Sequence, residues 1–584
     1  MLMRLPVRFL SLAVALALAA TLSGCGKKAP AAASTAPAGT ANLLIVNGLI
    51  YDGLGGAPVN GGVAVREGRV VAVGDVSSWT SGNTRDAEGL AIAPGFINTL
   101  SWATESLIQD GRGLSDLKQG VTLEVMGEGG SMGPLNDAMK AETIKQQSDI
   151  KYDIDWTTLG EYLDGLVKRG ISTNVASFVG ATTVRIHELG YANRAPTPEE
   201  LARMQALVAQ AMEEGALGVG ASLIYAPAFY AKTDELTALV RTAGAYGGGY
   251  IAHLRSEGNR LLEALDEHIG IARDAKTWAE VYHLKAAGEK NWPKMAQAIA
   301  KIEAARTAGL AISADMYAYT AGATGLDAAM PPWVQEGGLD AWLARLKDPK
   351  IRARVAQEIR TPSNDWENLY LSAGSPDKVL LIGFGNPKLK PLTGKSLAEV
   401  AKLRGKSPEE TIMDLVIEDH SRVSTAYFLM SEDNVRLGLA QPWVSLGSDE
   451  ASQAPEGPFL LANPHPRAYG NFARFLGYYA RENKLMSTAE AVRRLTSLPA
   501  NNFHLKQRGC LAVGCAADIV IFDADQVIDH ATFDQPQQFA TGMRDVFVNG
   551  VAVLRDGEPT GAKPGQVVRG SGWKGWKDTP KTRS

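Results

Sequence analysis

Strand-like and helix-like hydrophobic patterns alternate regularly through the middle of this chain, and this alternation limits the folds open to it. Apolar runs of strand length recur, and helical patterns lie between several of them. One helix start is explicit, because Thr197 precedes Pro198 and Glu200 in a capping box. The expected strands are residues 90–97, 120–127, 172–179, 217–223, 249–253, 280–283, 310–315 and 443–447.

Eight strands alternating with helices over about 400 residues predict an α/β fold, namely a (β/α)8 TIM barrel. We expect the barrel at residues 94–504. Residues 335–430 are too many for one strand–helix unit and carry their own helices, so they are interpreted as an insertion before the eighth strand. A doubly wound open sheet is the alternative, but no GxGxxG loop follows the first strand.

Short β-strands flank this region on both sides. The expected strands are residues 43–50, a hairpin at 62–73, and residues 517–522 and 546–553. No helical pattern of any length interrupts them. The two ends are therefore expected to meet in a small β-sandwich domain formed by residues 42–93 and 505–570.

The N-terminus has the pattern of an export signal. Arg4 and Arg8 precede an apolar run at residues 9–22, which is too short to span a bilayer. The run ends in Leu-Ser-Gly-Cys, which is typical of a bacterial lipobox, so residues 1–24 are interpreted as a lipoprotein signal peptide and Cys25 as the lipidated residue. An ordinary secretory signal peptide with a coincidental cysteine is the alternative.

Residues 25–41 lack periodicity and are expected to form a flexible tether. The mature protein would then be held to a membrane by the lipid on Cys25. The predicted location is the bacterial cell envelope, at the periplasmic face of the outer membrane.

Charge and cysteine content exclude other classes of protein. The net charge is −4, from 59 basic and 63 acidic residues, and no long basic run offers a surface for nucleic acid. Three cysteines cannot build a disulfide framework for this length or a four-thiolate zinc site. Whether Cys510 and Cys515 pair in an oxidising compartment is left open.

Residues suited to metal or proton chemistry stand at four predicted strand ends. Glu128 follows the second strand, His253 ends the fifth, His283 ends the sixth and Asp449 follows the eighth. In a TIM barrel these ends meet at the face that carries the active site. Two imidazoles and two carboxylates there predict a metal site. Glu128 is alternatively a helix cap or loop carboxylate that binds no metal.

Several segments together resemble the amidohydrolase superfamily and, within it, the D-aminoacylases (N-acyl-D-amino-acid deacylases), along nearly the whole mature chain. The resemblance rests on LIVNG at 44–48, APGFI at 93–97, QGVT at 119–122, LIYAP at 223–227, HLR at 253–255, HLK at 283–285, DMYAY at 315–319, SD at 448–449, HPR at 465–467 and ADIVIFD at 517–523. It implies a zinc-dependent barrel with a β-sandwich that hydrolyses an amide bond. His253 and His283 match the metal histidines, and Asp449 matches the catalytic aspartate.

The chain departs from this family at two places. The family has Asp-x-His-x-His after the first strand, whereas residues 98–102 are Asn-Thr-Leu-Ser-Trp. A metal-binding Cys of the family corresponds to Gly129, next to Glu128. The two-metal arrangement cannot be carried over, and we expect one zinc ion per chain, held by Glu128, His253 and His283. Leu100 and Trp102 would line the floor of the pocket.

The expected reaction is the deacylation of an N-acyl-D-amino acid or a related small D-residue compound. Asp449 would take a proton from the attacking water and deliver it to the leaving nitrogen. Lys285 and Tyr317 match substrate-contacting positions of the family. Arg255 and Arg467 are candidates for a substrate carboxylate, or else structural ion-pair residues.

Two other functions remain open from the sequence. One is hydrolysis of a cyclic amide in the manner of dihydroorotases. The other is a binding or scaffolding lipoprotein that kept the barrel and lost catalysis with the first-strand histidines. The joint presence of His253, His283, Lys285 and Asp449 favours an enzyme.

Overall fold

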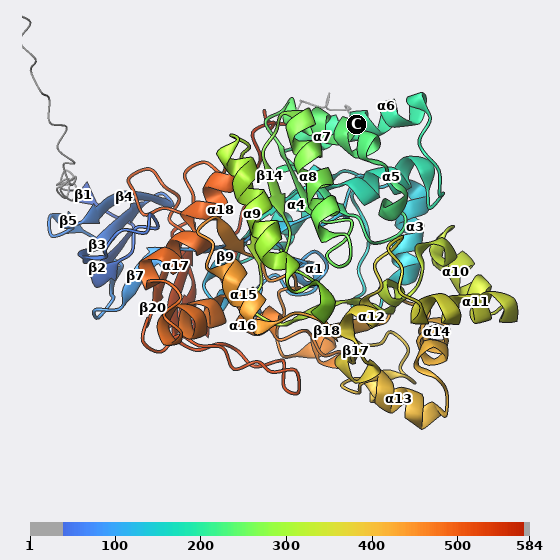
Figure 1. The fold of residues 1–584 in the computed structure, drawn as a ribbon. Helices are drawn as coiled ribbons and strands as arrows, with labels where there is room; N and C mark the ends of the chain where they lie inside the picture. The colour runs from blue at the N-terminus through green and yellow to red at the C-terminus, as the bar shows by residue number, and fades with distance from the viewer. Residues whose placement is uncertain (1–38, 577–584) are drawn as a thin grey trace, which may run out of the picture.

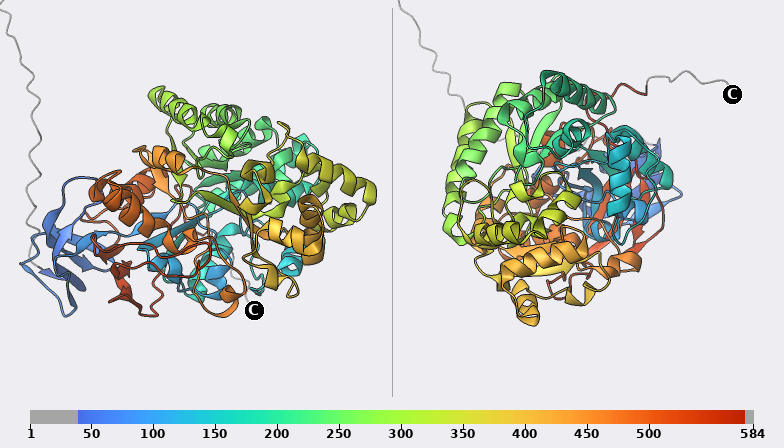
Figure 2. Two further views of the ribbon diagram at one scale, coloured as in Figure 1. Left: turned by 60° about the horizontal axis from the view of Figure 1, so that its bottom comes forward. Right: turned by 90° about the vertical axis from the view of Figure 1, so that its right-hand side faces the viewer.

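The computed structural model of the chain describes residues 39–576 and contains a (β/α)8 barrel with two additions (Figure 1). The predicted fold class is confirmed. A small β domain and the insertion lie on opposite sides of the barrel (Figures 1 and 2). The predicted signal peptide and Cys25 lie outside the described residues. Among residues 39–576, no helix has the length and hydrophobicity needed to cross a bilayer.

The wall of the barrel consists of parallel strands that follow one another in sequence order. They are β8 (Phe96–Asn98), β9 (Val121–Met126), β10 (Asn174–Ser177), β11 (Val179–Gly180), β12 (Gly218–Ser222), β13 (Gly249–His253), β14 (Ala279–Val281), β15 (Ile312–Met316) and β19 (Val444–Leu446). β10 and β11 are two parts of the third position in the wall. The ring closes where the Thr99 N–H donates to the Leu446 carbonyl oxygen at 3.2 Å.

Amphipathic helices cover the outside of the wall and bury their apolar faces in the largest hydrophobic cluster. They are α4 (Leu159–Arg169), α5 (Ala181–Leu189), α6 (Pro198–Glu213), α7 (Thr233–Gly244), α8 (Leu261–Ala275), α9 (Lys294–Thr307), α15 (Glu432–Leu439) and α17 (Thr488–Leu495). α6 starts as predicted, because Thr197 and Glu200 form the capping box.

The first predicted strand, residues 90–97, is divided in the structure. β7 (Ala91–Pro94) joins the small β domain, and only β8 belongs to the barrel. Gly95 makes this crossing possible: a Cβ atom there would lie 2.2 Å from the Thr122 hydroxyl oxygen. The prediction failed here because both segments are apolar and continuous in sequence.

Strands from both ends of the chain form one nine-stranded sheet in the small domain. They are β2 (Leu43–Ile50), β3 (Val59–Arg66), β4 (Arg69–Gly74), β6 (Thr84–Asp86), β7, β20 (Ile519–Phe522), β21 (Met543–Val548), β22 (Val551–Arg555) and β23 (Glu558–Pro559). β7 pairs with β2 on one side and with β20 on the other. The side chains of Arg85 and Asp545 form an ion pair of 2.8 Å between the two ends. Cys510 and Cys515 form a disulfide.

The predicted tether at residues 25–41 extends too far. β1 (Gly39–Thr40) pairs in parallel with β5 (Trp79–Thr80), so the folded part has begun by Gly39. Two residues carry too little pattern for sequence analysis to identify a strand.

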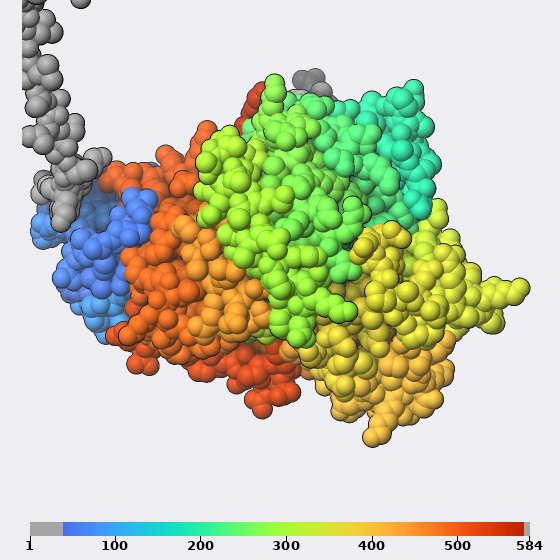
Figure 3. All heavy atoms as spheres, in the orientation of Figure 1, coloured from blue at the N-terminus to red at the C-terminus, as the bar shows by residue number. Residues whose placement is uncertain are grey.

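The insertion extends from β16 (Ala321–Gly325) to β18 (Ser424–Phe428), which pair antiparallel, with β17 (Val379–Gly383) on the other side of β18. It also contains α10 (Leu339–Leu346), α11 (Pro349–Arg360), α12 (Leu369–Ala373), α13 (Leu397–Arg404) and α14 (Pro408–Asp419). It begins before the predicted residue 335, because β16 finds its partner about a hundred residues later. The insertion packs around a hydrophobic cluster formed mostly by its own residues. In Figure 3 the insertion is the yellow lobe beside the barrel.

Candidate active site

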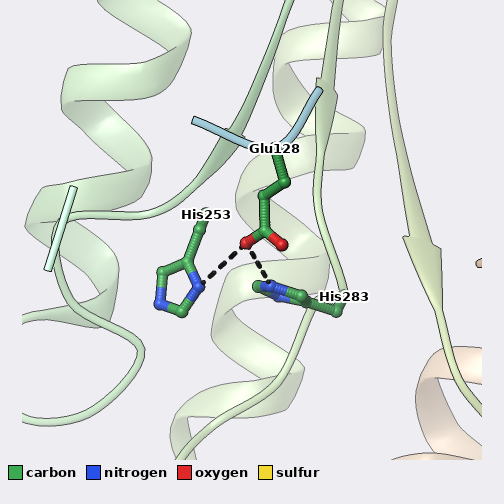
Figure 4. Close-up of side chains that lie close together, drawn as sticks. All are labelled: Glu128, His253 and His283. Atoms are coloured by element: carbon green, nitrogen blue, oxygen red, sulfur yellow. Dashed lines mark hydrogen bonds and ion pairs between the residues drawn. The ribbon is translucent and has the colours of Figure 1, made fainter. Parts of the chain in front are cut away.

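Glu128, His253 and His283 come together at the carboxyl ends of the barrel strands, as Figure 4 shows. Glu128 Oε1 lies 3.1 Å from His283 Nε2 and 3.4 Å from His253 Nδ1. One ligand atom from each residue lies within 4.8 Å of the others, and all three side chains are buried. The arrangement has the donor atoms and spacing of a metal site.

Glycines on both sides determine how Glu128 enters this site. Gly127 and Gly129 have φ angles of +109° and +66°, which L side chains rarely adopt. A Cβ atom on Gly129 would lie 2.5 Å from the Ser222 Cβ. Position 129 therefore has no room for a side chain in this backbone conformation, and position 128 supplies the ligand.

The two imidazoles are held from their outer sides by Glu257. Its carboxylate lies 3.0 Å from His283 Nδ1 and 3.6 Å from His253 Nε2. His253 ends β13, whereas His283 follows β14 with a φ of +35° and donates its backbone N–H to Asp315 at 2.6 Å. Glu257 thus contacts the outer nitrogen of the His283 ring and lies at ion-pair distance from that of His253.

Lys285 and Tyr317 lie next to this group. The Lys285 ammonium donates to Glu257 at 2.6 Å and lies 2.8 Å from His283 Nδ1, so it is already paired. It also lies 5.6 Å from the centre of the Tyr317 ring. The Tyr317 hydroxyl is buried and has no hydrogen-bond partner among residues 39–576, which leaves it available to a ligand.

Asp449 follows β19 with a φ of +52°. Its Oδ2 accepts from Arg467 at 2.8 Å, and its Oδ1 accepts from the Trp102 indole N–H at 3.1 Å. Burial raises the pKa of the Asp449 carboxyl, and the charge of Arg467 opposes this rise. A carboxylate with a raised pKa is suited to receive and return a proton.

The pKa of Glu128 changes in the opposite direction. Burial alone would raise this pKa, but hydrogen bonds from His253 and His283 hold it well below its usual range. These contacts favour the ionised form of Glu128, the form in which a carboxylate binds a metal.

Arg255 and Leu100 do not make the contacts in the site that the sequence suggested for them. The Arg255 guanidinium pairs with Glu267 at 2.7 Å and donates to backbone carbonyls of residues 229 and 231, so it is structural in this arrangement. Leu100 does not line the pocket floor, because it is fully buried in the barrel core. Arg467 is close to the site, but its charge serves Asp449.

The residues present fit a zinc ion. Zn²⁺ binds imidazole nitrogen and carboxylate oxygen, and a catalytic site uses three protein ligands with one position open. His253 Nδ1, His283 Nε2 and Glu128 Oε1 would supply this set, and Glu257 lies against the outer nitrogen of His283, where an outer partner of a metal-binding histidine is expected.

Sequence reasoning missed Glu257 and the polar role of Trp102. Glu257 stands four residues after His253, and a carboxylate in the loop after a ligand-bearing strand was the available signal. Trp102 was regarded as apolar, yet its indole N–H lies 3.1 Å from both Glu128 Oε2 and Asp449 Oδ1. The indole nitrogen is thus the atom through which Trp102 contacts the two carboxylates.

A cavity of about 1080 Å³ lies beside this group. It is lined by the loops after β13 and β14 and by residues 362–374 of the insertion. Glu128, His253 and His283 do not line it. The insertion contacts the surroundings of the site, for example where Glu367 accepts the Glu257 backbone N–H at 2.6 Å.

The chain is similar to known deacylases. The chain is 31% identical to a D-aminoacylase of Alcaligenes xylosoxydans over 531 residues, which cover 90% of this chain and 97% of the relative. A crystal structure of N-acyl-D-glutamate deacylase from Bordetella bronchiseptica, complexed with zinc and a phosphonate that mimics the tetrahedral intermediate, matches with a TM-score of 0.75. It is 29% identical, and the match covers 91% of this chain and all of that chain.

A solved D-aminoacylase with a binuclear metal centre, described by one-metal activation and second-metal attenuation, is 30% identical with a TM-score of 0.74. That match covers 90% of this chain and 99% of the other. The sequence model of the amidohydrolase family matches residues 83–554. The chain belongs to the amidohydrolase family and is a metal-dependent, amide-hydrolysing enzyme.

Proposed function

We propose that this enzyme removes the acyl group from N-acyl-D-amino acids with one bound zinc ion. The observation that carries the proposal is the convergence of Glu128, His253 and His283, with Asp449 linked to Glu128 through Trp102. The similarity to D-aminoacylase and to N-acyl-D-glutamate deacylase supports the substrate class.

In the proposed site, Glu128, His253 and His283 hold the ion. When bound, zinc supplies a Lewis acid that polarises the amide carbonyl and acidifies water. Asp449 accepts the proton of the water that attacks the carbonyl carbon. The C–N bond then breaks, and Asp449 returns the proton to the leaving nitrogen, so the products are a carboxylate and a free amino acid.

The surrounding residues have supporting roles in the proposal. Arg467 keeps Asp449 in place through its ion pair. Lys285 and Tyr317 border the space beside His283, and the free Tyr317 hydroxyl is the donor we assign to substrate. Arg255 is not included, because Glu267 already satisfies it.

The test is metal analysis together with a substrate panel. Purified protein prepared without chelator is expected to contain one zinc per chain and to hydrolyse N-acetyl-D-leucine, N-acetyl-D-glutamate or N-acetyl-D-aspartate. The L-enantiomers and the cyclic amides hydantoin and dihydroorotate serve as comparisons. Faster turnover of a cyclic amide would replace the proposed substrate class, and two zinc ions at full occupancy would refute the single-metal site.

We also propose that the enzyme is a lipoprotein of the bacterial cell envelope, anchored through Cys25. The apolar run at residues 9–22 and the Leu-Ser-Gly-Cys sequence support this proposal. The Cys510–Cys515 disulfide is in keeping with an oxidising compartment such as the periplasm.

A further inference from the structure

Trp102 lies between the metal group and Asp449, on a segment with fixed backbone pairing. Its backbone N–H donates to the Glu450 carbonyl oxygen at 2.9 Å, and the preceding Ser101 N–H donates to Val125 at 2.8 Å. The extension of the first barrel strand is thereby attached to β9 on one side and to the segment after β19 on the other. The backbone from which the indole extends is therefore held by the wall of the barrel.

The indole N–H of Trp102 lies between two carboxylates. Its Nε1 is 3.1 Å from Glu128 Oε2 and 3.1 Å from Asp449 Oδ1. Tryptophan offers one donor and no acceptor, so this N–H is shared between the two oxygens. Two buried carboxylates this close repel each other unless cations or donors lie between or beside them.

The other oxygens of these carboxylates have their own partners. Glu128 Oε1 faces His253 and His283, and Asp449 Oδ2 pairs with Arg467. The outer oxygens of both carboxylates thus have partners of their own, and the indole N–H is the donor between the two inner oxygens. Nε1 of Trp102 is within 3.1 Å of both Glu128 Oε2 and Asp449 Oδ1, the contacts that a cation bridging the two carboxylates would otherwise make.

We propose that the Trp102 indole N–H is a positioning group that fixes Glu128 and Asp449 relative to each other, in place of a bridging cation. The inference rests on the proposed function, because it assigns a metal ligand to one carboxylate and the proton carrier to the other. Trp102 directs Glu128 Oε1 toward the histidines and holds Asp449 Oδ1 toward the same space. Trp102 is 40% exposed, whereas Glu128 beside it is buried.

The test compares Trp102→Phe with Trp333→Phe. Each substitution keeps an aromatic ring and removes an indole N–H that donates to a carboxylate, but Trp333 donates to Glu358 in the insertion, at 2.8 Å. Rates of zinc loss to a chelator, and kcat and KM for N-acetyl-D-leucine, N-acetyl-D-glutamate and N-acetyl-D-aspartate, are measured for both variants and the wild type. Thermal unfolding of the metal-free proteins reports on folding.

Trp102→Phe is expected to lose zinc roughly 10-fold faster and to have a kcat lower by roughly 10-fold, with KM nearly unchanged, because a hydrogen bond to a charged group is lost. Trp333→Phe should match the wild type in all three quantities. If Trp102→Phe lost zinc at the wild-type rate and kept the wild-type kcat, the proposed role of Trp102 would be overturned, and the proposed function would stand. A wild type that binds zinc but hydrolyses none of the three substrates would refute the proposed substrate class, and zinc loss would still decide the role of Trp102. A wild type without zinc would overturn both.

Discussion

Substitution of Asp449 and substitution of a proposed zinc ligand should have different effects on zinc content. Asp449→Asn keeps the size of the side chain and removes its capacity to accept a proton, while Glu128, His253 and His283 stay in place. We expect hydrolysis of N-acetyl-D-amino acids to fall by roughly 10²- to 10⁴-fold, the usual contribution of general acid–base catalysis. Zinc content and thermal stability should change little.

His283→Ala is the comparison for this prediction, because it should lose zinc and activity together. An Asp449→Asn protein with the parental rate would remove Asp449 from the mechanism. If that variant lost its zinc as well, Asp449 would be a fourth protein ligand, and the roles assigned to the site would need revision.

Glu257 is the residue whose importance only the structure reveals. Its carboxylate lies behind both imidazoles and also pairs with Lys285. Glu257→Gln is expected to raise the dissociation constant for zinc by roughly 10- to 100-fold, as loss of such outer partners does. The variant should also unfold at a lower temperature, because the Lys285 ammonium is left buried without its counter-ion.

Chelator competition on the folded variant measures the zinc affinity of Glu257→Gln. Glu263→Gln is the matched control, because it makes the same change from glutamate to glutamine at an exposed position of α8. Equal zinc affinity in the two variants would mean that Glu257 supports Lys285 and does not orient the histidines.

At the level of secondary structure, the insertion is expected to have a stability of its own. Leu381 of β17 is fully buried in the hydrophobic cluster of the insertion, whereas Leu403 of α13 is 68% exposed. Leu381→Ala should lower the free energy of unfolding by about 2–5 kcal/mol, as a buried cavity does. Leu403→Ala should change it by less than about 0.5 kcal/mol, as surface substitutions usually do.

Urea denaturation of the two leucine variants measures this difference. Similar unfolding midpoints would mean that the insertion does not depend on the cluster around Leu381. A loss of activity in Leu381→Ala at low urea would show that the insertion supports the site through Glu367, whose carboxylate accepts the Glu257 N–H.

Features that depend on local sequence patterns could be predicted, whereas those that depend on contacts between distant residues could not. The seven later barrel strands and the positions of Glu128, His253 and His283 at their ends follow from local apolar runs, so sequence was sufficient. The start of the insertion depended on pairing between β16 and β18, which are far apart in sequence. For Arg255 the sequence left a substrate contact and a structural ion pair open, because its partner Glu267 lies on the next helix and nothing in the motif indicates that contact.

For the whole molecule, the proposed lipid anchor gives a direct prediction. Cys25→Ser removes the acylated thiol, so the protein should be released from membranes or processed incorrectly. Cell fractionation with and without high salt measures the distribution, since salt removes charge-mediated attachment but not a lipid anchor. A variant that fractionates with membranes like the parent would contradict the lipoprotein assignment.

The shared sheet of the small domain has a consequence for how the protein is made. Arg85 and Asp545, which join its two ends, are 460 positions apart. Until β20 has folded against it, β7 has β2 on one side and an open apolar edge on the other. Such an edge invites pairing with other chains. The small domain is therefore protected from such pairing only once the last strands of the chain have joined the sheet.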